Sequence, residues 1–272
     1  MTGVQTCALP ILGHLQIKSW IPEAAGAGTP GKTEKQRAYQ TLLTRAELLP
    51  WLEKLRNAGL MAFDTETTSL DYMAAEIVGV SFAVEPGQAA YVPLAHDYPA
   101  APVQLCRDET LRLLQPLLED EHRSKVGHNL KYDKNVLANH GITLRGCRHD
   151  TMLESYVLDS VATRHDLDSL ARKYLDCQTI TYEDVAGKGA KQVTFNRVPV
   201  EKAAEYAAED ADVTLALHRA LWPRIQEQPA LEQLYTGIEM PLMPVLSRME
   251  RNGVAIDVDM LRQQSRQLEE EL

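Results

Sequence analysis

The stretch Leu60-Met-Ala-Phe-Asp-Thr-Glu66 is a short apolar run that ends in two carboxylates separated by one residue. Short apolar runs bounded by turn signals are typical of buried strands, so residues 61–63 predict the first strand of a sheet. Alternate residues of a strand share a face, which lets Asp64 and Glu66 point the same way where the strand leaves the core. Two like charges held together are costly without a cation, and carboxylate oxygens suit Mg²⁺ or Mn²⁺. For this pair alone, the simpler alternative is a solvated strand end.

The sequence around this strand changes between strand and helix patterns. Apolar runs at residues 77–84 and 89–94 predict two more strands of a meander, and Val126 marks a short buried strand. We expect the helix that begins at Val200 to end before Pro223. Strands followed by interleaved helices indicate an α/β fold in which helices cover a mixed sheet. The apolar spacing predicts helices at residues 44–57, 109–118, 130–140, 151–158, 167–175, 200–221 and 231–251, and a last one capped by Asp257.

Charge and cysteine content exclude several classes of protein. The 272 residues contain 28 Lys and Arg against 38 Asp and Glu, a formal net charge of −10. The molecule as a whole therefore does not attract a polyanion, which excludes a basic, histone-like nucleic-acid binder. Cys7, Cys106, Cys147 and Cys177 lack the spacing of a zinc site and predict reduced thiols in a cytosolic protein. We expect no membrane role, because no apolar run is long enough to cross a bilayer.

Both ends of the chain differ from the middle. Residues 1–11 lack the basic and long apolar regions of a signal peptide and look like a translated sequencing adapter, with an ordinary disordered N-terminus as the alternative. Residues 12–36 include a stretch rich in Gly, Ala, Thr and Pro and predict a linker. At the other end, the sequence stops inside a helical pattern at Leu272 and looks truncated.

Two further segments carry acids at informative positions. Asp133 closes the segment Gly127-His-Asn-Leu-Lys-Tyr-Asp133, at the start of a predicted helix after a buried strand. Tyr206 and Asp210 are four residues apart, so they face the same way on a helix. Taken singly, Asp133 could complement a helix dipole and Asp210 could lie on a wet helix face. Together with the first pair, however, the acids follow the order DxE, NxxxD, YxxxD.

This ordered set resembles the three exonuclease motifs of the DEDD superfamily, in its tyrosine-bearing branch. From roughly residue 34 to the end, the chain is also similar to the bacterial DNA polymerase I family, the family A DNA polymerases, in segments without catalytic residues. The chain is therefore identified as a fragment of a member of this family. Segments that carry this similarity include Asp150-Thr-Met-Leu-Glu-Ser-Tyr156, Arg164-His-Asp-Leu-Asp-Ser-Leu170 and Met249-Glu-Arg-Asn-Gly253.

The resemblance implies a fold and a domain organisation. The expected fold is an α/β, RNase H-like mixed five-stranded sheet with flanking helices, followed by the first helices of a polymerase thumb. Residues 37–226 would then form a 3′-5′ exonuclease domain, and residues 227–272 the truncated start of a polymerase domain. The residues that catalyse DNA synthesis in the family would lie outside this chain.

The resemblance also implies a proofreading reaction. Two divalent ions, Mg²⁺ or Mn²⁺ with Zn²⁺ as an alternative at one site, would support hydrolysis of the 3′-terminal phosphodiester of single-stranded or frayed DNA. The product would be a nucleoside 5′-monophosphate. By match to the motifs, Asp64 would be shared by both ions, Glu66 and Asp210 would bind the ion that activates water, and Asp133 would bind the second. Tyr206 would orient the attacking water.

Contacts to the substrate follow from the same resemblance. Leu70 and Tyr132 would contact the terminal base, Asn129 and Lys131 the sugar or phosphate, and Arg164 a phosphate oxygen. For each of these side chains, ordinary packing or solvation is an equal alternative. We expect a monomer in the bacterial cytoplasm, associated with the nucleoid.

Two other functions remain open at this point. One is an RNase D-like RNA exonuclease, which shares the tyrosine-bearing motifs. The other is a catalytically silent structural domain, a reading that the complete set of four acids disfavours.

Overall fold

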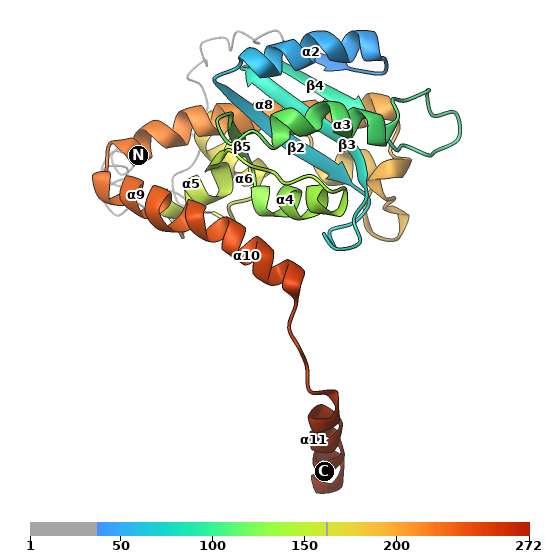
Figure 1. The fold of residues 1–272 in the computed structure, drawn as a ribbon, viewed down its shortest axis with the longest axis vertical. Coiled ribbons are helices and arrows are strands. Elements are labelled where there is room, and N and C mark those ends of the chain that lie inside the picture. The colour runs from blue at the N-terminus through green and yellow to red at the C-terminus, as the bar shows by residue number, and fades with distance from the viewer. Residues whose placement is uncertain (1–36, 162) are drawn as a thin grey trace, which may run out of the picture. The chain divides into compact units, whose positions relative to one another are not determined.

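The computed structural model describes residues 37–272 except residue 162. The expectations for the adapter-like residues 1–11, for the linker at 12–36 and for Cys7 lie outside the described residues. The described chain forms a mixed six-stranded sheet of order β1-β4-β3-β2-β5-β6 (Figure 1). Its strands are β1 (Ala38–Thr41), β2 (Leu60–Thr67), β3 (Ile77–Glu85), β4 (Gln88–Pro93), β5 (Ser124–Gly127) and β6 (Cys147–Asp150).

The α/β class is confirmed, but the expected number of five strands is wrong. β2, β3 and β4 form an antiparallel meander, while β5 pairs parallel with β2, and β6 pairs parallel with β5. The sixth strand is β1, which pairs parallel with β4 at the other edge. Both edge strands escaped prediction because each has only four residues and neither contains an apolar run.

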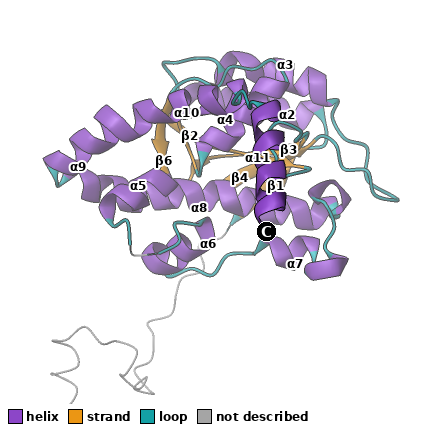
Figure 2. Ribbon diagram, turned by 90° about the horizontal axis from the view of Figure 1, so that it is seen from below, coloured by secondary structure: helices purple, strands orange, loops and turns teal. Residues whose placement is uncertain are grey.

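Helices cover both faces of the sheet, as Figure 2 shows. Phe63 of β2 points into the main core, together with buried side chains of α2 (Arg45–Asn57), α3 (Arg107–Leu118) and α4 (Leu130–Asn139). Its neighbour Ala62 points to the opposite face and packs against α8 (Val200–Gln226). This alternation follows from the two-residue period of a strand and gives β2 two buried faces.

α8 is the long helix of the second face. Ala203, Ala207 and Ala211 are fully buried on its sheet side, and such small residues let the helix axis approach the strands closely. The expected end of this helix before Pro223 is wrong, because the helix continues to Gln226. A proline costs one backbone hydrogen bond there, whereas buried Leu221 and Ile225 on either side keep the segment packed against the fold.

Shorter elements join α4 to α8 and continue beyond it. α5 (Thr151–Leu158) has the predicted bounds. The predicted helix at 167–175 is split into α6 (Leu167–Leu170) and a π-helical turn η2 (Ala171–Leu175). The remaining elements before α8 are α7 (Tyr182–Ala186) and the 3-10 turns η3 (Gly189–Lys191) and η4 (Phe195–Arg197); those after it are α9 (Pro229–Leu234), η5 (Tyr235–Glu239), α10 (Met240–Asn252) and α11 (Val258–Glu271).

The helices after α8 differ in how they are packed. α10 lies on α4, where Ser247 donates a hydrogen bond of 2.7 Å to the Asn135 side chain and Glu250 accepts one of 2.9 Å from the same residue. All side chains of α11 are exposed, and Asp257 caps it as predicted by accepting a bond from the Met260 N–H.

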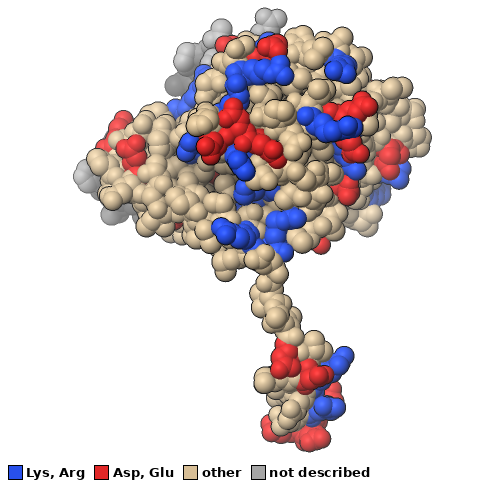
Figure 3. All heavy atoms as spheres, in the orientation of Figure 1, with Lys and Arg blue, Asp and Glu red and all other residues tan. Residues whose placement is uncertain are grey.

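The surface agrees with the charge balance of the sequence. Acidic and basic side chains are intermixed on the face drawn in Figure 3, which shows no continuous basic area. Cys106, Cys147 and Cys177 are free thiols, as predicted. Within the described residues, no helix has the length and apolar character needed to span a membrane.

Candidate active site

The site begins where β2 loses a neighbouring strand. β2 pairs with β3 along most of its length, but its pairing with β5 stops at Ala62. Farther along, Asp133 from the first turn of α4 takes the place of a strand partner. Its Oδ1 accepts hydrogen bonds from the Thr65 backbone N–H, at 3.0 Å, and from the Thr65 hydroxyl, at 2.6 Å. A carboxylate that is distant in sequence is thereby fixed at Thr65, the residue that separates the two acids of β2.

Three acids converge beside this bond. One carboxylate oxygen from each of Asp64, Glu66 and Asp210 lies within 4.8 Å of the others, and we call these three residues the carboxylate cluster. Asp64 and Glu66 share a face of β2 as the strand period predicts. Asp210 arrives from α8, which crosses the sheet at this point.

Electrostatics make the carboxylate cluster unfavourable without a cation. Burial raises the pKa of Asp64 to about 6. Burial also raises the pKa of Glu66 and of Asp133, and the negative charge of Asp64 raises both further. For Asp210, burial and then the charge of Asp64 raise the carboxyl pKa in the same way. Oε1 of Glu66 is buried and has no hydrogen-bond partner among the described residues. Divalent cations with a preference for oxygen ligands fit this donor set.

Tyr206 lies one helical turn before Asp210 on α8. Burial raises the pKa of its phenol well above the usual range, and the charges of Asp210, Glu66 and Asp64 raise it further. Its ring is held by aromatic neighbours, with centroids 5.8 Å from Phe195 and 6.4 Å from Tyr182. The phenol is therefore protonated at neutral pH and fixed in place, able to donate or accept a hydrogen bond.

A cleft of about 680 Å³ opens over the carboxylate cluster and Tyr206. One wall is the end of β2 and the turn after it, residues 67–70, together with Tyr132 of α4. The other wall consists of Tyr182 and residues 192–194. Leu70, 92% exposed, lies at the rim. The cleft thus combines a carboxylate floor with aromatic and aliphatic walls.

Two of the five expected substrate contacts line this cleft. Leu70 is free to contact a ligand, whereas the hydroxyl of Tyr132 donates a hydrogen bond of 2.5 Å to the Ser69 carbonyl and also contacts the Thr67 hydroxyl. The Tyr132 ring is consequently held against the first wall.

The other three expected contacts do not line the cleft. Lys131 forms an ion pair with Glu250 of α10. Arg164 is 86% exposed and pairs with Asp166 at 3.2 Å. Asn129 caps α4 in a left-handed conformation, with φ of 65°, and the structure assigns its side chain no bond at this cap.

Several cleft residues were not predicted. Thr65 carries no recognisable signal in the sequence, because its role is a long-range bond to Asp133. The second wall, Tyr182 and residues 192–194, flanks the basic segment Lys188-Gly-Ala-Lys191, and no sequence motif marks these wall residues. These residues reach the cleft because α7 and η4 pack beside α8.

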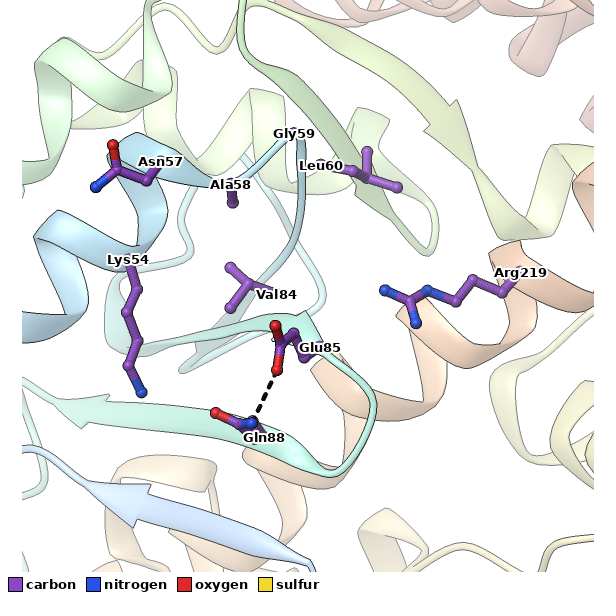
Figure 4. Close-up of a pocket in the computed structure, with 9 residues that line it drawn as sticks. All are labelled: Lys54, Asn57, Ala58, Gly59, Leu60, Val84, Glu85, Gln88 and Arg219. Atoms are coloured by element: carbon purple, nitrogen blue, oxygen red, sulfur yellow. Dashed lines mark hydrogen bonds between the residues drawn. The ribbon is translucent and has the colours of Figure 1, made fainter.

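A second hollow lies at the opposite end of β2. It has a volume of about 490 Å³ and is lined by residues 57–60 and by the adjoining ends of β3 and β4, at Val84, Glu85 and Gln88. Figure 4 shows Lys54 and Arg219 extending from α2 and α8 on opposite sides of Glu85. Glu85 is its one carboxylate and already accepts a 2.9 Å bond from Gln88. This hollow therefore lacks the acids that distinguish the cleft.

Comparison with known proteins agrees with this geometry. The model of a family described as 3′-5′ exonuclease matches residues 39–226. DNA polymerase I of Pseudomonas aeruginosa is 56% identical over an alignment of 269 residues that covers 95% of this chain and 30% of that protein. The chain thus spans less than a third of the length of this relative.

Solved structures share the fold. The POL domain of Pol1 from M. smegmatis, in complex with DNA primer-template and dNTP, aligns with a TM-score of 0.60 at 24% identity, over 82% of this chain and 34% of that one. Brucella melitensis NrnC with bound Mg²⁺ aligns with a TM-score of 0.56 at 18% identity, over 81% of this chain and 97% of that one.

Proposed function

Because the chain belongs to the 3′-5′ exonuclease family and carries the exonuclease domain of a DNA polymerase I, we propose that its cleft removes nucleotides one at a time from a single-stranded or frayed 3′ end of DNA. Each turnover hydrolyses the terminal phosphodiester and releases a nucleoside 5′-monophosphate. The observation that carries the proposal is the convergence of three carboxylates within 4.8 Å beside a partly buried tyrosine, on the floor of a cleft.

The family is metal-dependent, and the residues present fit two divalent ions. All the donors are oxygens, which favours Mg²⁺ or Mn²⁺, with Zn²⁺ as an alternative at one site. Asp64 would be shared by the ions, Glu66 and Asp210 would hold one, and Asp133 the other. When bound, such ions lower the pKa of water and neutralise charge on the phosphate and the leaving oxygen.

Side chains of the protein hold the carboxylates in place and orient the attacking water. Thr65 holds Asp133 through two hydrogen bonds, so this carboxylate needs no reorganisation when substrate arrives. Tyr206 stays protonated and orients the attacking water through its phenolic oxygen. Leu70 and Tyr132 contact the terminal base, and a strand end must leave its duplex to enter between the two walls.

The parent protein is proposed on the same basis. We place the exonuclease domain at residues 37–226 and the beginning of a polymerase domain at residues 227–272. The parent would be a DNA-directed DNA polymerase of replication and repair, acting as a monomer in the bacterial cytoplasm at the nucleoid.

The direct test uses purified chain and a 5′-labelled single-stranded DNA. With Mg²⁺ we expect stepwise shortening from the 3′ end and nucleoside 5′-monophosphates as the product; EDTA should stop the reaction. An RNA oligomer of the same sequence should be degraded more slowly. Faster degradation of the RNA would favour the RNase D-like alternative, and an intact DNA with bound Mg²⁺ would favour the structural one.

Tyr206→Phe tests the proposed orientation of water. The substitution keeps the ring and its packing but removes the hydroxyl, so we expect kcat to fall by about 10–100-fold with little change in KM. Steady-state initial rates on labelled DNA at varied concentration measure both constants. Tyr182→Phe is the matched control, because it removes a hydroxyl from the cleft wall and should change kcat little. Equal losses in the two variants would contradict the role given to Tyr206.

A further inference from the structure

A second group of potential metal ligands lies at the β6 edge of the sheet. His149 of β6, Glu154 of α5 and His218 of α8 each offer one ligand atom, and these atoms all lie within 4.8 Å of one another. We call them the His–Glu cluster. Nδ1 of His218 is 2.7 Å from Oε1 of Glu154, and Nδ1 of His149 is 3.3 Å from the same oxygen. None of the three lines the cleft over the carboxylate cluster.

The His–Glu cluster contains two buried polar atoms without partners. The Glu154 side chain is 0% exposed, and its Oε2 makes no hydrogen bond with any described residue. Nδ1 of His149 is also buried and makes no hydrogen bond in spite of its 3.3 Å distance from Glu154. An unsatisfied buried polar atom is costly, so two of them at one point indicate a common partner.

The chemistry of the donors selects the kind of partner. Two imidazoles and one carboxylate form a typical ligand set for Zn²⁺, whereas Mg²⁺ and Ca²⁺ prefer oxygen alone. The ligand atom of His218 lies at the same place, within 4.8 Å of the ligand atoms of the other two residues. A single cation could bind the free oxygen of Glu154 and the free nitrogen of His149 together.

The surroundings suit a structural ion. His149 is flanked by the rings of Trp222, at 4.7 Å between centroids, and Tyr235, at 6.4 Å. These rings shield the ligands from water, as an apolar shell does around a tightly bound metal. The three ligands come from a strand and two helices that are separate in sequence, so an ion would tie these elements together.

We propose that His149, Glu154 and His218 bind one divalent transition-metal ion of the Zn²⁺ class, at a site independent of the carboxylate cluster. The ion stabilises the junction of β6, α5 and α8. It takes no part in the hydrolysis.

Cobalt binding tests this proposal directly. Co²⁺ with nitrogen ligands in a four- or five-coordinate site absorbs visible light far more strongly than Co²⁺ surrounded by six oxygens. On titration of metal-free chain with Co²⁺, we expect intense visible bands that saturate at one equivalent. The bands should persist in Asp64→Asn, which impairs the carboxylate cluster, and disappear in His149→Phe and His218→Gln.

Stability measurements provide a second readout and the controls. Zn²⁺ at a hundredfold excess over its Kd should raise the Tm of the chain by about 5–10 °C in the Asp64→Asn background, and this increase should vanish when His149→Phe is added. Phe fills the aromatic stack and leaves the bond between His218 and Glu154 intact, so the variant should fold, which circular dichroism checks. His122→Gln, which removes an exposed imidazole, should behave like the unmodified chain.

Three results would overturn the proposal. They are weak absorption by Co²⁺ in the unmodified chain, intense bands that survive in folded His149→Phe, and bands that are lost in Asp64→Asn. Each would mean that the His–Glu cluster is only a buried hydrogen-bonded pair beside an aromatic stack.

Discussion

Asp64→Asn should lower the rate of 3′-terminal hydrolysis by about 10³-fold or more, and it should stabilise the metal-free protein at neutral pH. The loss of rate follows because Asp64 is the proposed ligand of both ions, which together supply several kcal/mol of transition-state stabilisation. The gain in stability follows because Asp64 is the common source of repulsion. Its charge raises the pKa of Glu66, Asp133 and Asp210.

The direction of the expected change in stability follows from the raised pKa of Asp64. The pKa of Asp64 is raised from 3.8 to about 6, so the fold favours the protonated carboxyl. A group of this kind contributes stability that is complete below its unfolded pKa and is lost as pH rises through its folded pKa. In EDTA, the unmodified chain should therefore gain stability between pH 7.5 and pH 5, by about 1–3 kcal/mol. Asp64→Asn should show less of this gain and a higher Tm at pH 7.5.

Thermal unfolding at both pH values, with EDTA and with Mg²⁺, measures these effects beside the nuclease assay. Mg²⁺ should stabilise the unmodified chain more than the Asn variant. Glu205→Gln is the matched control, because this exposed carboxylate precedes Tyr206 on the same helix. It should leave rate and Tm nearly unchanged. An active Asp64→Asn variant, or one that is less stable than the unmodified chain without metal, would contradict the proposed site.

The carboxylate cluster could be predicted from the sequence because local rules place its members. The two-residue period of a strand aligns Asp64 with Glu66, and the helical period aligns Tyr206 with Asp210. How the segments meet could not be predicted in the same way. The bond from Thr65 to Asp133 can form because β2 extends beyond the end of its pairing with β5. That extension is set only when the strands assemble into the sheet.

Polar and proline-containing segments account for the errors in the fold. β6 reads Cys147-Arg-His-Asp150 and has no strand-like apolar pattern, yet it is held by pairing with β5. Pro223 signals a helix end, but packing of α8 overrides the local preference. Long-range pairing also places Lys131, for which the sequence predicts a contact to DNA, in an ion pair with Glu250.

The largest effect on stability is expected at Asp150. This buried residue is the N-cap of α5, where its Oδ1 accepts hydrogen bonds from the N–H groups of Met152, at 3.0 Å, and Leu153, at 3.4 Å. The same carboxylate accepts bonds from Asn129, at 3.1 Å, and Leu130, at 2.8 Å, where α4 begins. One side chain thus accepts hydrogen bonds from the backbone N–H groups at the starts of two helices. It also holds Asn129 in its left-handed conformation.

Asp150→Ala should lower the free energy of unfolding by about 3–5 kcal/mol, as measured by urea denaturation. Loss of the cap accounts for about 0.5–2 kcal/mol, and the N–H groups of partly buried Asn129 and buried Leu130, which lose their partner, account for the rest. Such a loss is a large part of the 5–15 kcal/mol that typically stabilises a domain. Because α4 begins at Leu130 and carries Asp133 in its first turn, Mg²⁺-dependent hydrolysis should also fall in the fraction that stays folded.

Comparison with Asp257→Ala separates the stability lost with a helix cap from the stability lost with a buried carboxylate. Asp257 is also a helix N-cap, but it is exposed and accepts a single bond, from Met260 at 3.0 Å. Water can replace that bond, so the expected loss is at most about 1 kcal/mol. If the two substitutions cost the same, the bridge from Asp150 to α4 contributes nothing to stability. A cost several times larger for Asp150→Ala means that the buried carboxylate holds α4 and α5 together, and with them Asp133 in place beside β2.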